Sequence, residues 1–131
     1  MSLAGAGAVA IWHDIAPKGR DAFYAWHGTE HMPERASIPG FLRGRRYVAI
    51  AGAPEYFNLY ETADTAVLSG RDYLDRLDHP TPWTVATVAH FRGVARSLCE
   101  VAHSTGAGEG GLIATFRYDV AGARASEHRA V

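Results

Sequence analysis

The sequence predicts an α+β domain whose elements follow the order β-α-β-β-α-β. Two observations support this order: four segments have the pattern of extended chain, and the segments between them repeat apolar residues at helical spacing. Clusters of Gly, Pro, Asp and Thr separate the segments and predict turns. With 131 residues, 47% of them hydrophobic, the chain is long enough to bury a core without a metal or disulfide.

The first strand and the first helix have the clearest patterns. Residues 8–15 carry apolar side chains on both faces, which is typical of a buried strand. A helix is predicted next, because side chains recur at i, i+3, i+4 and i+7: Phe23, Trp26, His27 and Glu30. Pro33 is expected to stop or bend this helix near Met32.

The middle of the chain predicts an antiparallel hairpin. Residues 41–50 and 55–61 are extended, and Ala51-Gly52-Ala53-Pro54 separates them. A second helix is expected after the capping segment Thr62-Ala63-Asp64, because apolar and small residues recur at helical spacing: Val67, Gly70, Leu74 and Leu77.

Proline residues bound the last predicted elements. Pro80 ends the second helix, and Thr81-Pro82 opens a short helix that reaches Val88. Residues 91–103 alternate well enough for a fourth strand, although a helix is the competing interpretation. The complete order is the split β-α-β pattern of a ferredoxin-like fold with an antiparallel sheet.

Such a sheet has helices on one face only, so its other face needs a cover. Trp12 is expected to point away from Ile11 and Ile15, and Phe57 and Leu59 away from Tyr56, Asn58 and Tyr60. Large apolar groups on both faces would leave an exposed patch that monomers rarely tolerate. We therefore expect a homodimer that packs two sheets face to face.

The chain divides at a glycine-rich linker. Residues 1–105 form the predicted domain, and residues 106–131 hold the linker, an extra strand and the start of a helix. The stretch 111–121 repeats the pattern of 7–16. It is either the start of a second repeat or an edge strand that crosses to a partner.

Charge and composition exclude several classes of function. The net charge is −1 and Lys18 is the single lysine, so a surface that binds nucleic acid is not expected. The one cysteine, Cys99, excludes a disulfide framework and a cysteine-rich zinc site, and favours a cytoplasmic location. No apolar run approaches the length that crosses a membrane. No cofactor-binding motif is present, so neither a metal nor a cofactor is expected.

Histidines on the first helix are the first candidates for chemistry. His27 and His31 are four residues apart, so both lie on one stripe of the helix. Such a pair can ligate zinc, transfer protons near neutral pH, or simply pack beside a carboxylate. A metal site would require a third ligand, and Glu34 is the only local carboxylate that follows the pair.

Further polar residues could line a pocket. His79, with Tyr73 and Trp83, is placed at a pocket mouth, or else it ends a helix. Tyr56, Asn58 and Tyr60 share a strand face, with Tyr47 expected opposite them on the paired strand, and they line either a cavity or a dimer contact. Arg92 and Arg96 could anchor a carboxylate or pair with Glu100, and His13 needs a hydrogen-bond partner if it is buried.

The motifs together resemble a known superfamily. Phe23-x-x-Trp26-His27-x-x-x-His31-Met32-Pro33-Glu34, Ile38-Pro39-Gly40-Phe41, Arg46-Tyr47 and Tyr60-Glu61 resemble the dimeric α/β-barrel superfamily, nearest to its EthD-like branch, over residues 7–103. The resemblance implies a ferredoxin-like fold and dimerisation. Members include cofactor-free monooxygenases, isomerases, polyketide cyclases, haem enzymes and proteins with no known activity.

A second, shorter resemblance concerns polyketide cyclases. Tyr73 and His79-Pro80 resemble a segment of stress-responsive members, some of which are cyclases. Those cyclases carry a further His after the proline, whereas this chain has Thr81-Pro82-Trp83-Thr84. This departure argues against carrying the cyclase reaction over directly.

We therefore expect a protein that binds a small hydrophobic or aromatic molecule, with or without catalysis. As an enzyme it would be a cofactor-independent monooxygenase, cyclase or isomerase, with His27 or His31 as base and a tyrosine or His79 polarising a carbonyl. The alternative is a non-catalytic ligand-binding or interaction module. The candidate catalytic residues are His27, His31, Tyr73 and His79, and the candidate substrate-binding residues are Trp26, Tyr47, Tyr56, Asn58, Tyr60 and Trp83.

Overall fold

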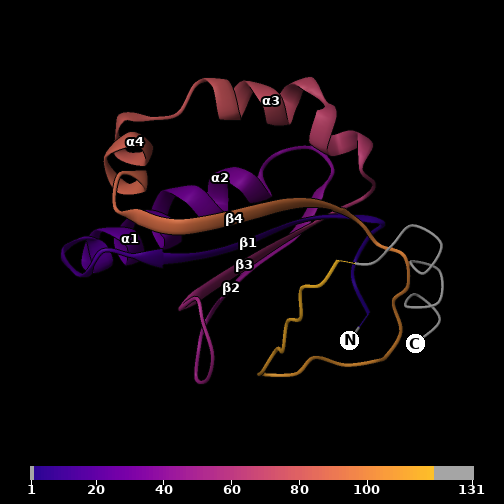
Figure 1. The fold of residues 1–131 in the computed structure, drawn as a ribbon. Helices are drawn as coiled ribbons and strands as arrows, with labels where there is room; N and C mark the ends of the chain where they lie inside the picture. The colour runs from indigo at the N-terminus through magenta and orange to yellow at the C-terminus, as the bar shows by residue number, and fades with distance from the viewer. Residues whose placement is uncertain (1, 120–131) are drawn as a thin grey trace.

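A computed structural model describes residues 2–119 and contains a four-stranded antiparallel sheet in the order β2-β3-β1-β4 (Figure 1). The strands are β1 (Gly7–Ile15), β2 (Phe41–Val48), β3 (Tyr56–Thr62) and β4 (Phe91–Glu100). The helices lie on one side of the sheet. This is the predicted ferredoxin-like arrangement, and the fourth segment is a strand rather than the competing helix.

The first helical region is one continuous run with a change of geometry inside it. It consists of the 3₁₀ turn η1 (Pro17–Gly19), α1 (Arg20–Trp26), the π-helical turn η2 (His27–His31) and α2 (Met32–Ala36). Pro33 does not end the helix near Met32, because it occupies the first turn of α2, where no helical N–H is required. The run continues to Ala36.

The second helical region is divided, where the sequence predicted a single helix before Pro80. Its elements are the 3₁₀ turn η3 (Ala66–Ser69), α3 (Arg71–Asp78) and α4 (Pro82–Val88). Gly70 separates the first two because its backbone is extended, with ψ 156°. Thr81 begins α4 as predicted, and its hydroxyl accepts a hydrogen bond from the backbone N–H of Thr84.

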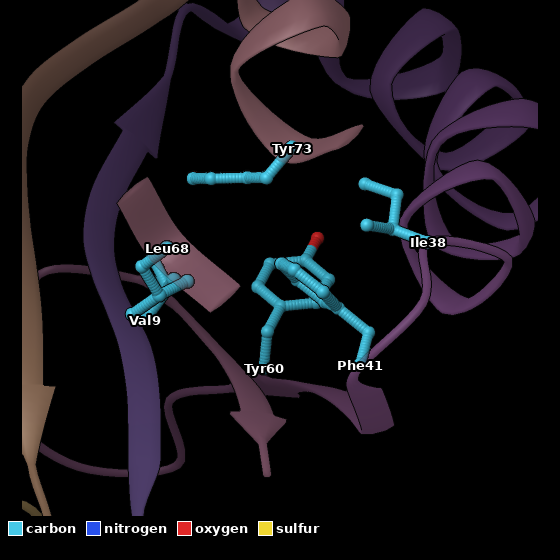
Figure 2. Packing of buried hydrophobic residues seen from close by; sticks show 6 residues of the cluster. All are labelled: Val9, Ile38, Phe41, Tyr60, Leu68 and Tyr73. Atoms are coloured by element: carbon cyan, nitrogen blue, oxygen red, sulfur yellow. The ribbon is translucent and has the colours of Figure 1, made fainter. Parts of the chain in front are cut away.

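The core lies between the helices and the sheet. One cluster of buried side chains joins β1, β2 and β3 to the helices that cover them: Val9, Ile38, Phe41, Tyr60, Leu68 and Tyr73 (Figure 2). A second cluster lies under α1 and consists of Ile15, Phe23, Trp26 and Tyr56. The turn into β2 needs Gly40, whose φ is 91°.

The opposite side of the sheet carries an aromatic cluster that no helix of residues 2–119 covers. We call this side the outer face and define it by Trp12, Tyr47 and Phe57. Phe57 is paired with Trp12 on β1 and with Tyr47 on β2. Its ring centroid lies 5.0 Å from that of Trp12 and 6.0 Å from that of Tyr47. Apolar groups therefore occupy both faces, as predicted.

The position of Tyr47 corrects one expectation. The sequence placed it opposite the polar face of β3, but the register pairs Tyr47 with Phe57 and pairs Val48 with Tyr56. Because a shift of one residue moves a side chain to the other face, Tyr47 lies on the outer face. It is therefore separated by the sheet from the buried face of β3.

The chain after β4 crosses beneath the sheet on the side away from the helices (Figure 1). Residues 101–119 form no strand or helix within the described part of the chain. An edge strand that crosses to a partner would need that partner, so this expectation stays a prediction. The predicted helix start falls on residues 120–131, which lie outside the described residues.

The helices of the described residues are short. Over residues 2–119, no helix combines the length and apolar character needed to cross a membrane.

Candidate functional site

Aromatic and polar side chains are buried together between the sheet and the first helical run. The sheet contributes His13 from β1 and Asn58 and Tyr60 from β3, and the π-turn contributes His27 and His31. We call these five residues the histidine cluster. Nearly all of the surface of His13, His27, Asn58 and Tyr60 is buried. Buried imidazole and amide groups normally form hydrogen bonds, so the partners of each polar atom determine which atoms donate and which accept.

His13 and Asn58 fix one another's orientation. The Nε2 atom of His13 lies 3.0 Å from Nδ2 of Asn58, and its Nδ1 lies 3.2 Å from the carbonyl oxygen of Asp14. A carbonyl only accepts and an amide nitrogen only donates, so His13 carries its hydrogen on Nδ1 and accepts on Nε2. Burial lowers the pKa of His13 and outweighs the hydrogen bond and the charge of Asp14, which raise it, so the neutral imidazole is favoured.

This arrangement leaves one oxygen of the cluster without a partner. Because the Asn58 amide nitrogen faces His13, its Oδ1 atom points elsewhere, and it is buried with no hydrogen-bond partner among residues 2–119. A buried unsatisfied oxygen costs free energy that a bound donor would recover. The Asn58 Oδ1 atom can therefore accept a further hydrogen bond.

His27 connects the helical run to β2 and β3. Its Nδ1 atom lies 3.4 Å from the Arg46 guanidinium, and its Nε2 lies 3.4 Å from the Tyr60 hydroxyl. Since the guanidinium only donates, Nδ1 accepts and Nε2 carries the hydrogen. Burial, then the positive charge of Arg46, then His13 lower the pKa of His27 to about 3. The Tyr60 hydroxyl accepts from Nε2, so its own hydrogen remains for another acceptor.

His31 is the second histidine of the π-turn and the second member with an unpartnered atom. Its ring centroid lies 5.4 Å from that of His27 and 6.1 Å from that of Tyr60. Its Nδ1 atom is buried, and no described residue forms a hydrogen bond with it. Burial, then Arg35, then His27 lower the pKa of His31 to about 2. Both imidazoles of the turn are therefore neutral near pH 7, and burial raises the pKa of the nearby Tyr60 phenol.

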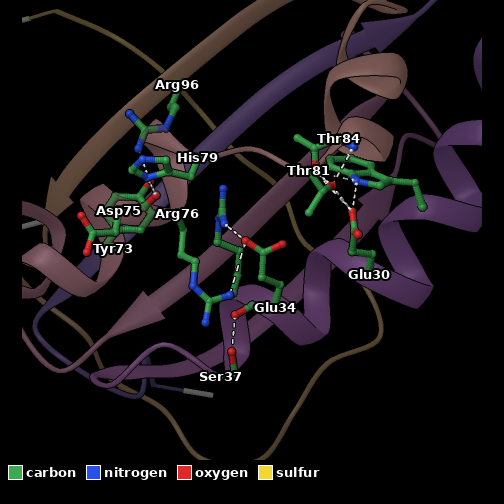
Figure 3. A network of polar contacts seen from close by, with 12 residues as sticks. Glu30, Glu34, Ser37, Tyr73, Asp75, Arg76, His79, Thr81, Thr84 and Arg96 are labelled. Carbon is green, nitrogen blue, oxygen red and sulfur yellow. Dashed lines mark hydrogen bonds and ion pairs between the residues drawn. The ribbon is translucent and has the colours of Figure 1, made fainter.

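Trp26 anchors the π-turn to α4. Its indole N–H lies 3.1 Å from Oε2 of Glu30 and 3.0 Å from the Thr84 hydroxyl. The Thr81 hydroxyl donates to the same Glu30 oxygen at 2.8 Å (Figure 3). This network ties the turn that carries both histidines to the N-terminus of α4.

The residues predicted at a pocket mouth are dispersed. Tyr73 is buried in the apolar core, and its hydroxyl accepts a hydrogen bond from Arg96 (Figure 3). His79 is exposed at the end of α3, where its Nδ1 lies 3.0 Å from the Asp75 carbonyl oxygen, so it ends the helix as the alternative interpretation held. Trp83 is 40% exposed on α4.

The structure therefore assembles part of the predicted set. Trp26, His27, His31, Asn58 and Tyr60 come together, and the ring of Tyr56 borders His13 at 5.4 Å. Tyr47, His79 and Trp83 lie outside this assembly. Sequence reasoning missed Arg46 as a partner of His27; its register opposite Asn58 on the buried face was the available signal.

Metal binding has no support from the arrangement of side chains. Among residues 2–119, no three or more His, Cys, Asp or Glu side chains are grouped so that they could hold a metal ion. The Arg46 guanidinium already lies beside His27, and the unpartnered atoms belong to one imidazole and one amide.

Comparisons with known proteins agree with the fold. No protein-family model and no curated protein sequence matches the chain. Similar solved structures include an antibiotic biosynthesis monooxygenase, with 17% identity, a TM-score of 0.52, and coverage of 72% of this chain and 96% of that one. HapK from Hahella chejuensis has 18% identity and a TM-score of 0.52, and covers 79% and 97% of the two chains.

A third similar structure is a mutant of SnoaB, a cofactor-independent oxygenase from Streptomyces nogalater. It has 15% identity and a TM-score of 0.50, and the match covers 73% of this chain and 92% of that one. At such low sequence identity, the similarity of these structures to the chain shows the fold alone. The chain has the predicted ferredoxin-like fold, and these solved structures are similar to it in fold.

Proposed function

We propose that the chain binds a small hydroxylated aromatic molecule at the histidine cluster and acts on it without a cofactor. The observation that carries this proposal is the pair of buried polar atoms without partners, Oδ1 of Asn58 and Nδ1 of His31. They lie among aromatic rings on the covered side of the sheet. Apolar walls with a few polar anchors are typical of small-molecule sites.

The donors and acceptors of the cluster suggest which ligand groups would bind. Oδ1 of Asn58 can only accept, so it needs an O–H or N–H group from the ligand. The Tyr60 hydroxyl accepts from His27 and keeps a hydrogen to donate, which suits a ligand carbonyl. Trp26 and Tyr56 add aromatic surface at the margins of the cluster. A phenol with a neighbouring carbonyl would satisfy both groups.

The low basicity of the imidazoles limits the proton transfers that they can perform. A general base is most effective when its pKa is near the working pH. With pKa values of about 3 and about 2, His27 and His31 hold a proton poorly. They are suited to a substrate whose own proton is acidic because its anion is delocalised over an aromatic system. In this proposal Tyr60 takes the carbonyl-polarising role that the sequence had given to a tyrosine or His79.

Oxygen insertion is the reaction that this chemistry and the comparisons support best. Two of the similar structures are described as a monooxygenase and a cofactor-independent oxygenase. In the proposed reaction, an activated CH₂ group beside a phenol reacts with O₂. One oxygen atom becomes a carbonyl oxygen, and the other leaves as water with the two hydrogens of the CH₂ group. The substrate supplies the electrons, so no cofactor is needed.

Ligand binding can be tested with naphthol and naphthalene, which differ by one hydroxyl group. We expect calorimetry to show that naphthol binds about tenfold more tightly, because only naphthol can donate to Oδ1 of Asn58. The variant Asn58→Leu should abolish this preference. His31→Phe should weaken naphthol binding while keeping the ring shape, and His79→Asn is the control outside the cluster. Equal affinities for the two probes in the natural chain would contradict the proposed site.

The alternative function is a ligand-binding module without catalysis. It is favoured by the same low pKa values, since imidazoles that hold protons poorly can bind a phenol without reacting. An oxygen electrode separates the two functions. Uptake of O₂ with a hydroxylated aromatic that carries an activated CH₂ group, lost in His31→Phe, supports the oxygenase. Naphthol binding without O₂ uptake across a panel of such compounds supports the binding module.

We also propose that two copies of the chain pack through their outer faces. The argument is that Trp12, Tyr47 and Phe57 form an aromatic cluster on a face that no helix covers. A two-fold contact would bury both clusters. A cytoplasmic location remains a prediction from the sequence.

A further inference from the structure

The outer face already has an occupant within the same chain. Residues 109–117, which we call the strap, follow β4 and run beneath the sheet on the side away from the helices (Figure 1). We propose that the strap holds the outer face within one chain and that a second copy must displace it to form the dimer. The inference rests on the dimer proposed above, and it adds a competitor that would set the dimer's affinity.

The strap is held at both of its ends. At the first end, the Glu109 carboxylate pairs with Arg45 and lies 3.6 Å from Arg43, both on β2. At the other end, the indole N–H of Trp12 donates to the Thr115 hydroxyl at 3.0 Å. The Arg117 guanidinium lies 4.5 Å from the centroid of the same indole. The strap therefore contacts Trp12, one of the residues that the dimer would bury.

Between its ends the strap packs loosely. A pocket of about 890 Å³ separates residues 111–116 from the hairpin that joins β2 to β3, with Trp12, Tyr47 and Phe57 in its wall. The apolar side chains of the strap gain little burial from this contact, since Leu112 is 77% exposed and Phe116 is 84% exposed. A permanent cover would bury these side chains against the aromatic cluster.

The strap is therefore attached mainly by polar contacts that water can replace. The Glu109 side chain is 58% exposed, and ion pairs with exposed partners contribute little to stability because water screens them. A second copy can offer an aromatic surface in place of these contacts, since it carries the same three rings. The competition then favours the strap at low protein concentration and the second copy at high concentration.

The ion pairs between the strap and the arginines of β2 can be removed by substitution, which allows the competition to be tested. Glu61 pairs with Arg43 on the outer face, and Glu109 adds the second carboxylate beside Arg43 and Arg45. Removing the charge of Glu109 should release the first end of the strap without altering the sheet. Removing the hydroxyl of Thr115 should weaken the second end, where the contact between Arg117 and Trp12 remains.

The test is sedimentation velocity of the full chain from micromolar to millimolar concentration. Glu109→Gln and Thr115→Val should each tighten the dimer by about fivefold, because each removes one attachment of the competitor. Asp72→Asn on α3 and Thr105→Val before the strap are matched controls that should leave the dimer unchanged. In monomeric samples, the NMR signal of the Trp12 indole N–H should shift in Thr115→Val.

Two results would overturn the inference, and they can be told apart. Glu109→Gln and Thr115→Val could form dimers that are as strong as those of the natural chain, or weaker. This result would show that the strap does not compete with the second copy, whereas the proposed dimer would stand. Absence of any dimer in the natural chain and in both variants would overturn the dimer itself, and the inference with it.

Discussion

The imidazole of His31 stacks on the indole of Trp26, with ring centroids 4.3 Å apart and planes inclined by 26°. The two residues are five positions apart, a spacing that an ordinary α-helix places on different faces. The π-turn at His27–His31 brings them together because its hydrogen bonds span five residues instead of four. Local helix geometry therefore decides which side chains meet above β3.

The pH dependence of stability should report the buried imidazoles. His27 and His31 have pKa values of about 3 and about 2 in the fold and 6.5 when unfolded, so below pH 6.5 the unfolded chain binds more protons. Stability is therefore complete above pH 6.5 and falls as the pH decreases. Between pH 6.5 and about pH 5 each imidazole should cost about 2 kcal/mol. Urea titrations at several pH values measure this loss.

His31→Phe is the variant that tests this assignment. It removes one buried imidazole and should reduce the decrease in unfolding free energy with falling pH. His103→Asn alters an exposed side chain and should leave the decrease unchanged. If the two variants follow the same curve as the natural chain, the imidazole of His31 is not buried in its neutral form.

Gly40 should be harder to replace than Gly52, although both have positive φ values of 91° and 85°. A Cβ atom on Gly40 would lie 2.5 Å from Cγ2 of Val67, whereas a Cβ atom on Gly52 would meet nothing within 4 Å. Gly52→Ala therefore measures the cost of the backbone conformation alone, about 1 kcal/mol. Gly40→Ala should cost about 1–3 kcal/mol more, because it also overpacks the core. Equal losses in thermal unfolding would contradict the packing between Gly40 and Val67.

Thr81 should contribute more to stability than Thr65. The Thr81 hydroxyl accepts from the Thr84 backbone N–H and donates to Glu30, whereas Thr65 precedes η3 without a side-chain capping bond. Thr81→Ala should therefore lower the unfolding free energy by about 1–2 kcal/mol, and Thr65→Ala by much less. Chemical denaturation measures both. The tryptophan fluorescence of Thr81→Ala should also change, because Glu30 accepts from Trp26.

Arg43 should be more important for folding than its neighbour Arg45. The Glu61 side chain is almost completely buried, and Arg43 donates to both of its carboxylate oxygens. Burial alone would raise the pKa of Glu61, but the Arg43 and Ala4 hydrogen bonds reverse this and lower it. Arg43→Met would leave the buried carboxylate without its main partner and should cost about 3 kcal/mol.

Arg45→Met is the matched control for that substitution. Arg45 also pairs with Glu109, so both variants lose a contact with the strap, but only Arg43 has hydrogen bonds with Glu61. The difference between their unfolding free energies therefore reports the Glu61 contact together with the hydrogen bond from Arg43 to the Ser2 carbonyl oxygen. A difference close to zero would show that the buried carboxylate is compensated in another way.

The fold was predictable because the burial of one face of a strand or helix determines where apolar residues recur in the sequence. Residues 8–15 and 55–61 differ by one residue or less at each end from β1 and β3, and Thr81-Pro82 marks the start of α4. The prediction that a helix stops at Pro33 was wrong, because proline is acceptable in the first turn of a helix. Sequence alone does not reveal that α2 begins at Met32.

The site was only partly predictable for a related reason. Histidine spacing placed His27 and His31 on one helix, but their rings are tilted beside each other, and the stacked partner of His31 is Trp26. The hairpin register, which depends on the bulge between Phe41 and Arg43, decides that Tyr47 lies on the outer face. Single-residue shifts of this kind arise from tertiary packing and leave no separate signal in composition or spacing.

The π-turn also bears on how this site could change during evolution. Removing Gly28 would leave Trp26 and His31 four residues apart, a spacing that an ordinary α-helix places on one face. The two rings would therefore stay on the same side of the helix, whereas His27 and His31 would be only three residues apart. A deletion of one codon would thus replace the π-turn with an ordinary helical turn while leaving all four strands intact, and an insertion could restore it.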